Sequence, residues 1–382
     1  MVLLGGSDIK LRQPRSKKEK KVDNSKLRPW SELHEALLRL ITKQLGAIDY
    51  IMFGCVCRGW RLHVTTHRQE FMASRPPLLV FLSTQAKRAS YFYSIFEQRL
   101  YKAKLPNLNG KSCFGITRGY LVMEDNKKRA DSQIWLLNPF TRHELHFPSP
   151  PNPYSRMILA SLATPLQEFV IIAFCIWYPS LQFFRLKDLS WTVHDYSDKF
   201  NGCRGPSPWA IVDGAVLKGK LYVLTSYAEN GVLNLNSTPY VTLLEVKNTR
   251  YLHRGLQLLA HDEQLLMING LMNGIGIMKE ECQVYELNFM KMEWMRIQNF
   301  TDQALFLDYD MGSRFSNMTI WGWSQQYSNC IYNVGVTCKC ILNFSDGRYR
   351  GSFWILQGNR MPHFTLGVPF WYFPHLSCNL VM

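Results

Sequence analysis

The chain has 382 residues, of which 47% are hydrophobic and 13% aromatic, and it carries a formal net charge of +15 at pH 7. This length exceeds what one hydrophobic core usually serves, so we expect a small module joined to a larger domain. The 18 Tyr, 22 Phe and 11 Trp favour strands and argue against an all-helical protein.

Residues 1–28 form a polar segment without hydrophobic periodicity, and we predict a disordered basic tail there. This tail contains nine Lys and Arg residues and only three acidic residues, so much of the net positive charge of the chain is concentrated in it. The segment "RSKKEKK" is consistent with either a nuclear import signal or a solvated tail. The remaining positive charge forms no basic face interleaved with aromatic residues, so we do not expect a nucleic-acid partner.

The ten cysteines are scattered through apolar, strand-like sequence, and the start "MVLLGGSDIK" is too short in its apolar part for a signal peptide. The strongest apolar run, "FVIIAFCIWYP", is far shorter than a membrane span. We therefore expect reduced cysteines, no membrane partner, and a location in the nucleus, the cytoplasm or both.

Residues 29–72 are predicted to form a compact helical module. Four apolar residues recur at helical spacing: Leu37, Leu38, Ile41 and Leu45. Gly46 can end this helix, and Asp49 can cap the next one. A module this small has little core of its own, so it is suited to share an apolar surface with a partner.

Residues 77–376 show short apolar runs separated by Gly, Pro, Asn and Asp, which is the pattern of strands and turns. A strand-like run followed by a strand pair recurs, as in "RGYLVMED" with "IWLLNPFTRHELHFP" and "DEQLLMING" with "CQVYELNFMKMEWMRI". Five such units are clear, and "PLLVFLS" with "SYFYSIFEQRLYKAKLP" is a weaker sixth. Their spacing is measured from five marker leucines: Leu137, Leu186, Leu244, Leu287 and Leu342.

Successive markers lie 43 to 58 residues apart. Repeats of several strands at this spacing are typical of propeller blades, because stacked small sheets bury faces that one sheet alone would expose. The predicted fold is therefore a small all-α module followed by an all-β domain, a kelch-like β-propeller. A β-sandwich or two ordinary β domains with coincidental spacing are the alternatives.

The segment from Trp30 to Arg61 resembles the F-box, whose pattern begins with Trp and ends in Val-Cys-Arg-x-Trp-Arg. Twelve residues match the positions of that pattern: Trp30, Leu33, Leu37, Leu38, Ile41, Leu45, Asp49, Val56, Cys57, Arg58, Trp60 and Arg61. His34 stands where the family usually has Pro, which should weaken the start of the helix without forbidding it.

The F-box resemblance implies three helices that bind a Skp-type adaptor, and through it a cullin. The apolar residues that it implies for adaptor binding are Leu33, Leu37, Leu38, Ile41, Leu45, Val56 and Trp60. The alternative is that these residues form only an internal helical core.

The rest of the chain resembles plant F-box proteins with a KIB-type β-propeller domain. The motifs that carry this resemblance include "GITRGYLVMED", "DGAVLKGKLYVL", "DQALFLD" and "PFWYFPHL", and they occur in the family's order. Asp308 stands where that family commonly has Gly. The resemblance implies a substrate receptor and leaves its target open.

We interpret the chain as the substrate-recognition subunit of a Skp–cullin–F-box ubiquitin ligase, with catalysis supplied by other subunits. No catalytic, cofactor or metal motif is recognisable, and the pairs Cys55/Cys57 and Cys338/Cys340 lack a second pair at zinc spacing. The target-binding residues are unknown, although loop aromatics are candidates: Trp177, Tyr178, Trp321 and Trp323. The alternatives are a non-ligase F-box binding protein and a propeller that binds a sugar or another small molecule.

Overall fold

The computed structural model describes residues 30–82, 89–95, 97–105, 110–125, 132–162, 168–175, 179–185, 188–197, 210–235, 239–247, 256–272, 278–300, 302–308, 319–322, 328–334, 339–343, 349–352 and 370–374. For residues 162, 168, 270–272, 278–282, 319–322, 333, 339–343 and 349–352 it describes the backbone alone. The predicted basic tail, residues 1–28, lies outside the described residues.

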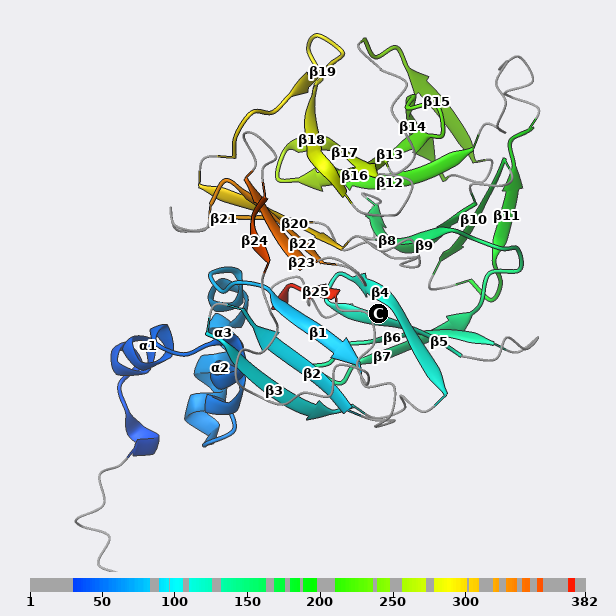
Figure 1. The fold of residues 1–382 in the computed structure, drawn as a ribbon. Helices are drawn as coiled ribbons and strands as arrows, with labels where there is room; N and C mark the ends of the chain where they lie inside the picture. Colours follow the sequence, from blue (N-terminus) through cyan, green and yellow to red (C-terminus); the bar gives the residue numbers. More distant parts are fainter. Residues whose placement is uncertain are drawn as a thin grey trace, which may run out of the picture.

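The N-terminal part is helical. It consists of the 3-10 turn η2 (Trp30–Glu32) and the helices α1 (Glu35–Lys43), α2 (Ala47–Phe53) and α3 (Arg58–Ala73) (Figure 1). The imidazole Nδ1 of His34 accepts a hydrogen bond from the backbone N of Ala36 at 3.3 Å, so His34 caps α1. The Cys57 sulfur accepts from the backbone N of Trp60 at 3.5 Å and caps α3 in the same way.

Two expected helix boundaries are wrong. Helix α1 ends at Lys43, and Gly46 is the N-cap of α2 in extended conformation rather than the end of α1. Asp49 lies inside the first turn of α2, where a negative charge suits the helix dipole, and it does not cap the helix. A Cβ atom at position 46 would lie 2.3 Å from the carboxylate Oε1 of Glu97, so any larger residue would have to displace that side chain.

The rest of the described chain is built from six sheets. The first three in chain order are β25-β1-β2-β3 (Phe370–Tyr372, Leu78–Leu82, Ala89–Ser94, Arg99–Lys104), β4-β5-β6-β7 (Lys111–Thr117, Tyr120–Asp125, Gln133–Leu137, Glu144–Pro148) and β8-β9-β10-β11 (Arg156–Leu162, Glu168–Phe174, Ser180–Arg185, Thr192–Asp195). The next two are β12-β13-β14-β15 (Ile211–Leu217, Lys220–Thr225, Asn230–Asn234, Tyr240–Leu244) and β16-β17-β18-β19 (Leu256–His261, Gln264–Met272, Met278–Asn288, Glu293–Arg296).

The sixth sheet has five strands in the order β21-β20-β22-β23-β24 (Thr319–Gly322, Gln303–Asp308, Cys330–Val334, Lys339–Asn343, Tyr349–Ser352). It departs from the others because β20 and β22 pair in parallel, with Leu305 opposite Ile331. The remaining pairs in the described sheets are antiparallel, as the hairpin-like sequence pattern predicts.

The six sheets form a closed ring, and the domain is a β-propeller (Figure 1). Closure comes from β25, near the end of the chain, which pairs with β1 so that Val80 lies opposite Phe370. The backbone N of Trp371 donates to the Asp308 carboxylate at 2.9 Å, and the Tyr372 hydroxyl donates to the carbonyl of Gly119 at 3.2 Å. The first sheet therefore combines both ends of the propeller sequence and is bonded to both neighbouring sheets.

The same two-residue turn recurs in two sheets, which supports the repeat seen in the sequence. Arg118 and Gly119 both have positive φ (44° and 74°) between β4 and β5, and Lys218 and Gly219 do so between β12 and β13 (49° and 73°). Positive φ at both central residues is the hairpin turn that matches strand twist, and glycine adopts it without steric cost.

Leu186 lies outside the described residues, and among the other four markers of the repeat one was assigned wrongly. Leu137 lies in the third strand of its sheet, whereas Leu244 ends the fourth strand of its own sheet. The residue equivalent to Leu137 is Leu233. Leu137 pairs with Leu121, which lies two residues after the turn glycine Gly119. In the same way, Leu233 pairs with Leu221, two residues after Gly219. The strand that contains Leu233, "NGVLN", was missed because Asn and Gly are rare in strands.

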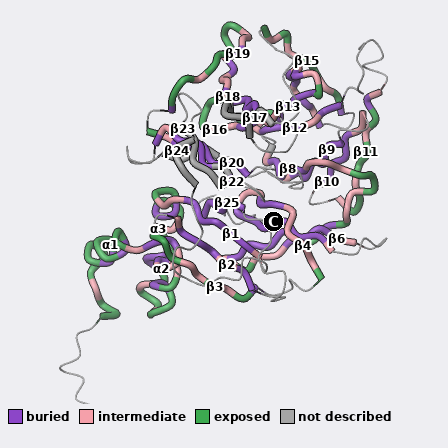
Figure 2. The backbone as a smooth tube through the Cα atoms, in the orientation of Figure 1, coloured by how far each residue is buried: buried purple, intermediate pink, exposed green. Residues whose placement is uncertain are grey.

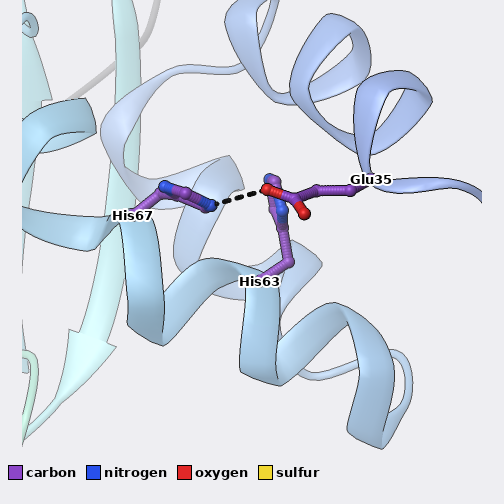
Figure 3. Close-up of side chains that lie close together, drawn as sticks. All are labelled: Glu35, His63 and His67. Carbon is purple, nitrogen blue, oxygen red and sulfur yellow. Dashed lines mark hydrogen bonds and ion pairs between the residues drawn. The ribbon is translucent and has the colours of Figure 1, made fainter.

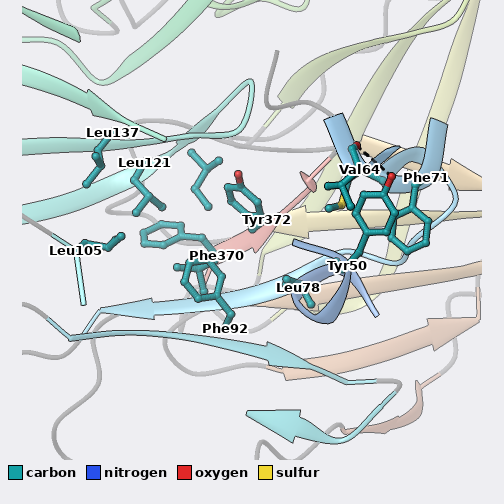
Figure 4. Packing of buried hydrophobic residues seen from close by; sticks show 14 of the residues in the cluster. Tyr50, Val64, Phe71, Leu78, Phe92, Leu105, Leu121, Leu137, Phe370 and Tyr372 are labelled. Carbon is teal, nitrogen blue, oxygen red and sulfur yellow. Dashed lines mark hydrogen bonds between the residues drawn. The ribbon is translucent and has the colours of Figure 1, made fainter. Parts of the chain in front are cut away.

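A continuous buried cluster joins the helical module to the first two sheets. It contains Tyr50 and Phe71 from the helices and Leu78, Phe92, Leu121 and Phe370 from the propeller (Figure 4). Figure 2 shows that buried residues also run along the central strands of the sheets, while exposed residues concentrate on the helices and the outer strands. Within the described part of the chain, no helix combines the length and apolarity needed to span a membrane.

The side chains of five cysteines are described, and none of the five forms a disulfide: Cys55, Cys57, Cys113, Cys175 and Cys330. Cys175 and Cys330 are buried as expected, whereas Cys55, two residues after α2, is exposed. Burial raises the pKa of Cys113 to about 12, so this thiol is protonated at neutral pH.

Candidate functional site

The helical module is held together by aromatic pairs. Tyr50 stacks on Phe71 with ring centroids 3.7 Å apart, and Phe53 stacks on Trp60 at 4.1 Å. The indole Nε1 of Trp60 donates to the carbonyl oxygen of Trp30 at 2.9 Å, which ties η2 to α3. These contacts use Tyr50, Phe53, Trp60 and Phe71 for internal packing, whereas Trp30 and several aliphatic residues remain exposed.

An unusual share of the exposed apolar side chains lies on this small module. Of the fourteen large hydrophobic residues exposed in the described chain, seven fall between residues 30 and 62. They are Trp30, Leu37, Leu40, Ile41, Met52, Val56 and Leu62. Several are more than half exposed, with Met52 at 61%, Val56 at 62% and Leu62 at 68%. Concentrated exposure of this kind is typical of a protein–protein interface.

Helix α1 shows this surface most simply. Leu37, Leu40 and Ile41 are three and four residues apart, so they share one face of the helix, and all three are exposed. Leu38 lies at the border of this face, on the buried side of the helix with Thr42, and only 6% of its surface is exposed, in the cluster beneath the helix. Figure 1 shows α1 on the side of the module that points away from the propeller.

The seven residues implied for adaptor binding therefore fall into two groups. Leu37, Ile41 and Val56 are exposed, as a docking surface requires. Leu38 is buried, and three others are half-buried and pack against the internal cluster: Leu33, Leu45 and Trp60. The structure thus assigns Leu38 to the interior of the module, because its position on α1 faces α2 and α3.

Four exposed residues were missed by the sequence-based assignment, namely Trp30, Leu40, Met52 and Leu62. Leu40 could have been found, because it lies three residues after Leu37 on the same helical face. Trp30 matches the F-box pattern, but nothing in the sequence predicted that its side chain is exposed. Met52 and Leu62 depend on how α2 and α3 are rotated in the module, which periodicity over such short helices does not define.

The module is attached to the propeller by polar contacts in addition to the shared core. The Arg99 guanidinium on β3 forms an ion pair with Asp49 on α2, with Nη1 2.7 Å from the carboxylate oxygen. Within the module, Nη2 of Arg75, just after α3, donates to the carbonyl of Lys43 at 2.7 Å, which holds α1 to the chain that leads into the first sheet. The apolar surface is therefore held in one orientation relative to the first sheet.

The loop aromatics considered for target binding are largely outside the described residues. Trp177, Tyr178 and Trp323 are not described, and for Trp321 only the backbone position in β21, opposite Ala304, is given. The structure consequently defines the surface of the helical module but not a target site on the propeller.

Comparison with protein families identifies both parts of the chain. The F-box domain model matches residues 30–71, and the KIB1-4 beta-propeller model matches residues 92–354, which is more than half of the chain. The chain belongs to the KIB1-4 β-propeller family. It is thus an F-box protein with a KIB1-4 propeller, as the sequence resemblance implied, and F-box domains generally bind Skp1-type adaptors.

Other comparisons add little to this assignment. No curated protein matches the chain. Among solved structures, a crystal structure of BBS1N in complex with ARL6DN, soaked with mercury, is similar at 15% sequence identity with a TM-score of 0.33. That match covers 64% of this chain and 75% of the other, and a similarity this weak carries no argument about function.

Proposed function

We propose that this KIB1-4 protein is the substrate-recognition subunit of a Skp–cullin–F-box ubiquitin ligase. The observation that carries the proposal is the exposed apolar surface of the F-box, centred on Leu37, Leu40 and Ile41 of α1. In this role the chain has no catalytic residues of its own. It raises the local concentration of a bound target near the ubiquitin-carrying subunit.

The attachment between the two domains supports this role. The shared core and the Arg99–Asp49 ion pair fix the F-box to the first sheet of the propeller. A receptor needs such a fixed relation, because a target held on one end of a flexible link would reach the ubiquitin carrier less often. The target would bind the loops of one propeller face, and the protein would act in the nucleus, the cytoplasm or both.

The experiment is a quantitative binding assay between the full chain and a Skp-type adaptor. The test variant is Leu37→Ala/Ile41→Ala, which removes exposed side chains and leaves the buried Leu38 and the Trp60 stack intact. Each truncation of a well-packed interface residue costs roughly 1–2 kcal/mol, so the double variant should bind about thirtyfold to a thousandfold more weakly.

The matched control is Val193→Ala/Leu243→Ala, which removes two exposed aliphatic residues from the outer strands β11 and β15. This variant should bind the adaptor like the wild type. The proposal is contradicted if folded wild-type protein does not bind a Skp-type adaptor, or if the two double variants bind equally well.

A further inference from the structure

Three potential metal ligands from two helices meet at one point of the F-box. Glu35 is the first residue of α1, and His63 and His67 lie on α3 (Figure 3). One ligand atom from each residue lies within 4.8 Å of the others. The carboxylate Oε1 of Glu35 and Nε2 of His67 are already 3.2 Å apart. In the described chain this is the one such group of three.

The sequence explains why the two imidazoles are neighbours. His63 and His67 are four residues apart on α3, so they lie on the same face, and their ring centroids are 4.9 Å apart. Glu35 reaches them because the start of α1 crosses this face of α3 (Figure 3). The pair of histidines alone would be a common surface feature, and the carboxylate from a second helix makes it a three-ligand cluster.

His63 is a second and independent indication of a ligand. Its side chain is directed toward Glu35 and only 7% of the residue is exposed, yet its Nδ1 atom is buried without a hydrogen-bond partner (Figure 3). A buried nitrogen without a partner costs about 1–3 kcal/mol, so buried polar atoms in native proteins are nearly always satisfied. This imidazole therefore has an unused nitrogen beside the cluster, and coordination of a cation through a lone pair of a ring nitrogen would give the ring a partner.

Arg39 is the competing cation. Its Nε and Nη2 atoms donate to Oε1 of Glu35 at 3.2 and 2.9 Å, the same oxygen that lies nearest to His67. These bonds, and the one from His67, keep the pKa of Glu35 below its ordinary value, so the carboxylate is ionised. The Arg39 side chain is 56% exposed, which lets it rotate into solvent when a cation takes its place.

We propose that Glu35, His63 and His67 form a Zn²⁺ site that holds α1 against α3. Two imidazoles and one carboxylate are typical zinc ligands, with the metal about 2.0–2.2 Å from each ligand atom and a water molecule in the fourth position. Tetrahedral ligands at that distance lie roughly 3.3–3.5 Å apart, so the cluster reaches this geometry by small side-chain rotations.

The site would act on the helix that carries the exposed apolar face. Besides the contacts of the buried Leu38 and the bond between Glu35 and His67, α1 is tied to the rest of the module by the bond from Arg75 to the carbonyl of Lys43. A metal at Glu35 would fix the opposite end of the same helix. Zinc binding can be measured without an adaptor, so it can be tested separately from the ligase role.

The test is titration of the untagged, chelator-treated full chain with Zn²⁺ by calorimetry, with Co²⁺ as a spectroscopic probe. Wild-type protein should bind Zn²⁺ and give visible Co²⁺ absorption bands of a tetrahedral site. Glu35→Gln and His67→Gln should each weaken binding at this site by at least about tenfold. Arg39→Gln should strengthen it a few-fold, because a like charge beside the metal is removed.

The matched control is His146→Gln. His146 also lies beside a carboxylate, with Nε2 3.6 Å from Glu144, but it belongs to no group of three ligands among the described residues. The His146→Gln variant should bind Zn²⁺ as tightly as the wild type. Circular dichroism checks that each variant is folded, and hydrogen exchange of residues 35–43 should slow with Zn²⁺ in the wild type but not in His67→Gln.

Two results would overturn the proposal. One is that wild-type protein fails to bind Zn²⁺. The other is that Glu35→Gln and His67→Gln bind it as tightly as His146→Gln does, which would assign the metal to the cysteines or to other surface groups.

Discussion

The carboxylate of Asp213 on β12 lies 2.6 Å from the guanidinium Nε of Arg156 on β8, and both side chains are nearly buried. The other carboxylate oxygen accepts a hydrogen bond from the backbone N of Leu258 on β16 at 2.8 Å. One side chain therefore joins three successive sheets near the centre of the propeller. Burial raises the pKa of Asp213, and Arg156 opposes this shift.

We predict that Asp213→Ala lowers the free energy of unfolding by about 3–5 kcal/mol, because it leaves a buried guanidinium without its counter-ion. The double variant Arg156→Met/Asp213→Asn should recover most of this loss. It removes both charges and keeps an acceptor for the N–H of Leu258. Urea denaturation followed by fluorescence measures the difference.

The control is Glu263→Ala, which breaks the exposed ion pair between Lys218 and Glu263 (3.1 Å). Exposed pairs contribute about 0–1 kcal/mol, so this variant should be close to wild type. A loss of stability in Asp213→Ala no greater than that in Glu263→Ala would show that the buried contact does not stabilise the ring.

Asp308 gives a second prediction, at the closure of the propeller. Its carboxylate accepts from the backbone N of Trp371, a residue with no exposed surface whose ring packs on Phe306 with centroids 5.0 Å apart. Asp308→Ala should cost about 1–3 kcal/mol, because a buried N–H loses its acceptor. The control is Asp302→Ala, at an exposed turn before the same strand. In chemical denaturation its free energy of unfolding should fall by less than about 0.5 kcal/mol.

The Asp308 contact also explains a departure from the family pattern. Sequence alone showed Asp where glycine is common, without a reason for the change. The structure places this carboxylate opposite the incoming strand β25, whose N–H groups need acceptors. The acceptor and the donor are 63 residues apart, so no local pattern could have linked them.

Local signals in the sequence predicted a good part of the fold. The turns at Gly119 and Gly219 and the alternating runs beside them define hairpins whose geometry depends on a few adjacent residues. The strand Asn230–Asn234 could not be predicted in this way, because the space at Gly231 is limited by a side chain of the paired strand. A Cβ atom there would lie 2.9 Å from Val241.

The candidate site was predicted less completely than the fold. Helical spacing identified Leu37 and Ile41 as members of one face, and both are exposed. The same spacing did not show that Leu38 faces inward, since that depends on how α1 lies against α3. The meeting of Glu35 with His63 and His67 was not predicted either, because residues 28 and 32 positions apart are brought together only by the packing of two helices.

His34 allows a third prediction, about the start of α1. Its φ of −59° matches the fixed angle of proline, and among the described residues its backbone N–H has no hydrogen-bond partner. His34→Pro loses the cap to Ala36 and gains rigidity in the unfolded chain, so the two effects should cancel within about 1 kcal/mol. Adaptor binding should be retained or improved.

A proline inside the same helix provides the contrast. Leu40→Pro removes a backbone donor within α1 and should cost roughly 3 kcal/mol in thermal or urea unfolding of the F-box. Equal losses in His34→Pro and Leu40→Pro would mean that position 34 lies inside the helix rather than at its start.

Tyr50 gives a final prediction, on alkaline pH. Its ring is fully buried against Phe71, its hydroxyl donates to the carbonyl of Val64 at 3.1 Å, and burial raises its pKa to about 12. In the unfolded chain a tyrosine loses its proton near pH 10. Between these values the folded state holds a proton that the unfolded state has released, so stability falls as pH rises from 10 to about 12.

Tyr50→Phe should lower the free energy of unfolding by about 1 kcal/mol at pH 8, because the Val64 carbonyl loses its hydrogen-bond donor. Phenylalanine has no hydroxyl to ionise, so the variant has no counterpart of the proton release that destabilises the wild type. Its stability should consequently fall less steeply than that of wild type between pH 10 and 12. Urea midpoints measured across this range test the difference, with Tyr240→Phe, at an exposed position on β15, as the control. Parallel curves for wild type and Tyr50→Phe would show that the buried hydroxyl does not control alkaline unfolding, since the two proteins differ only in that group.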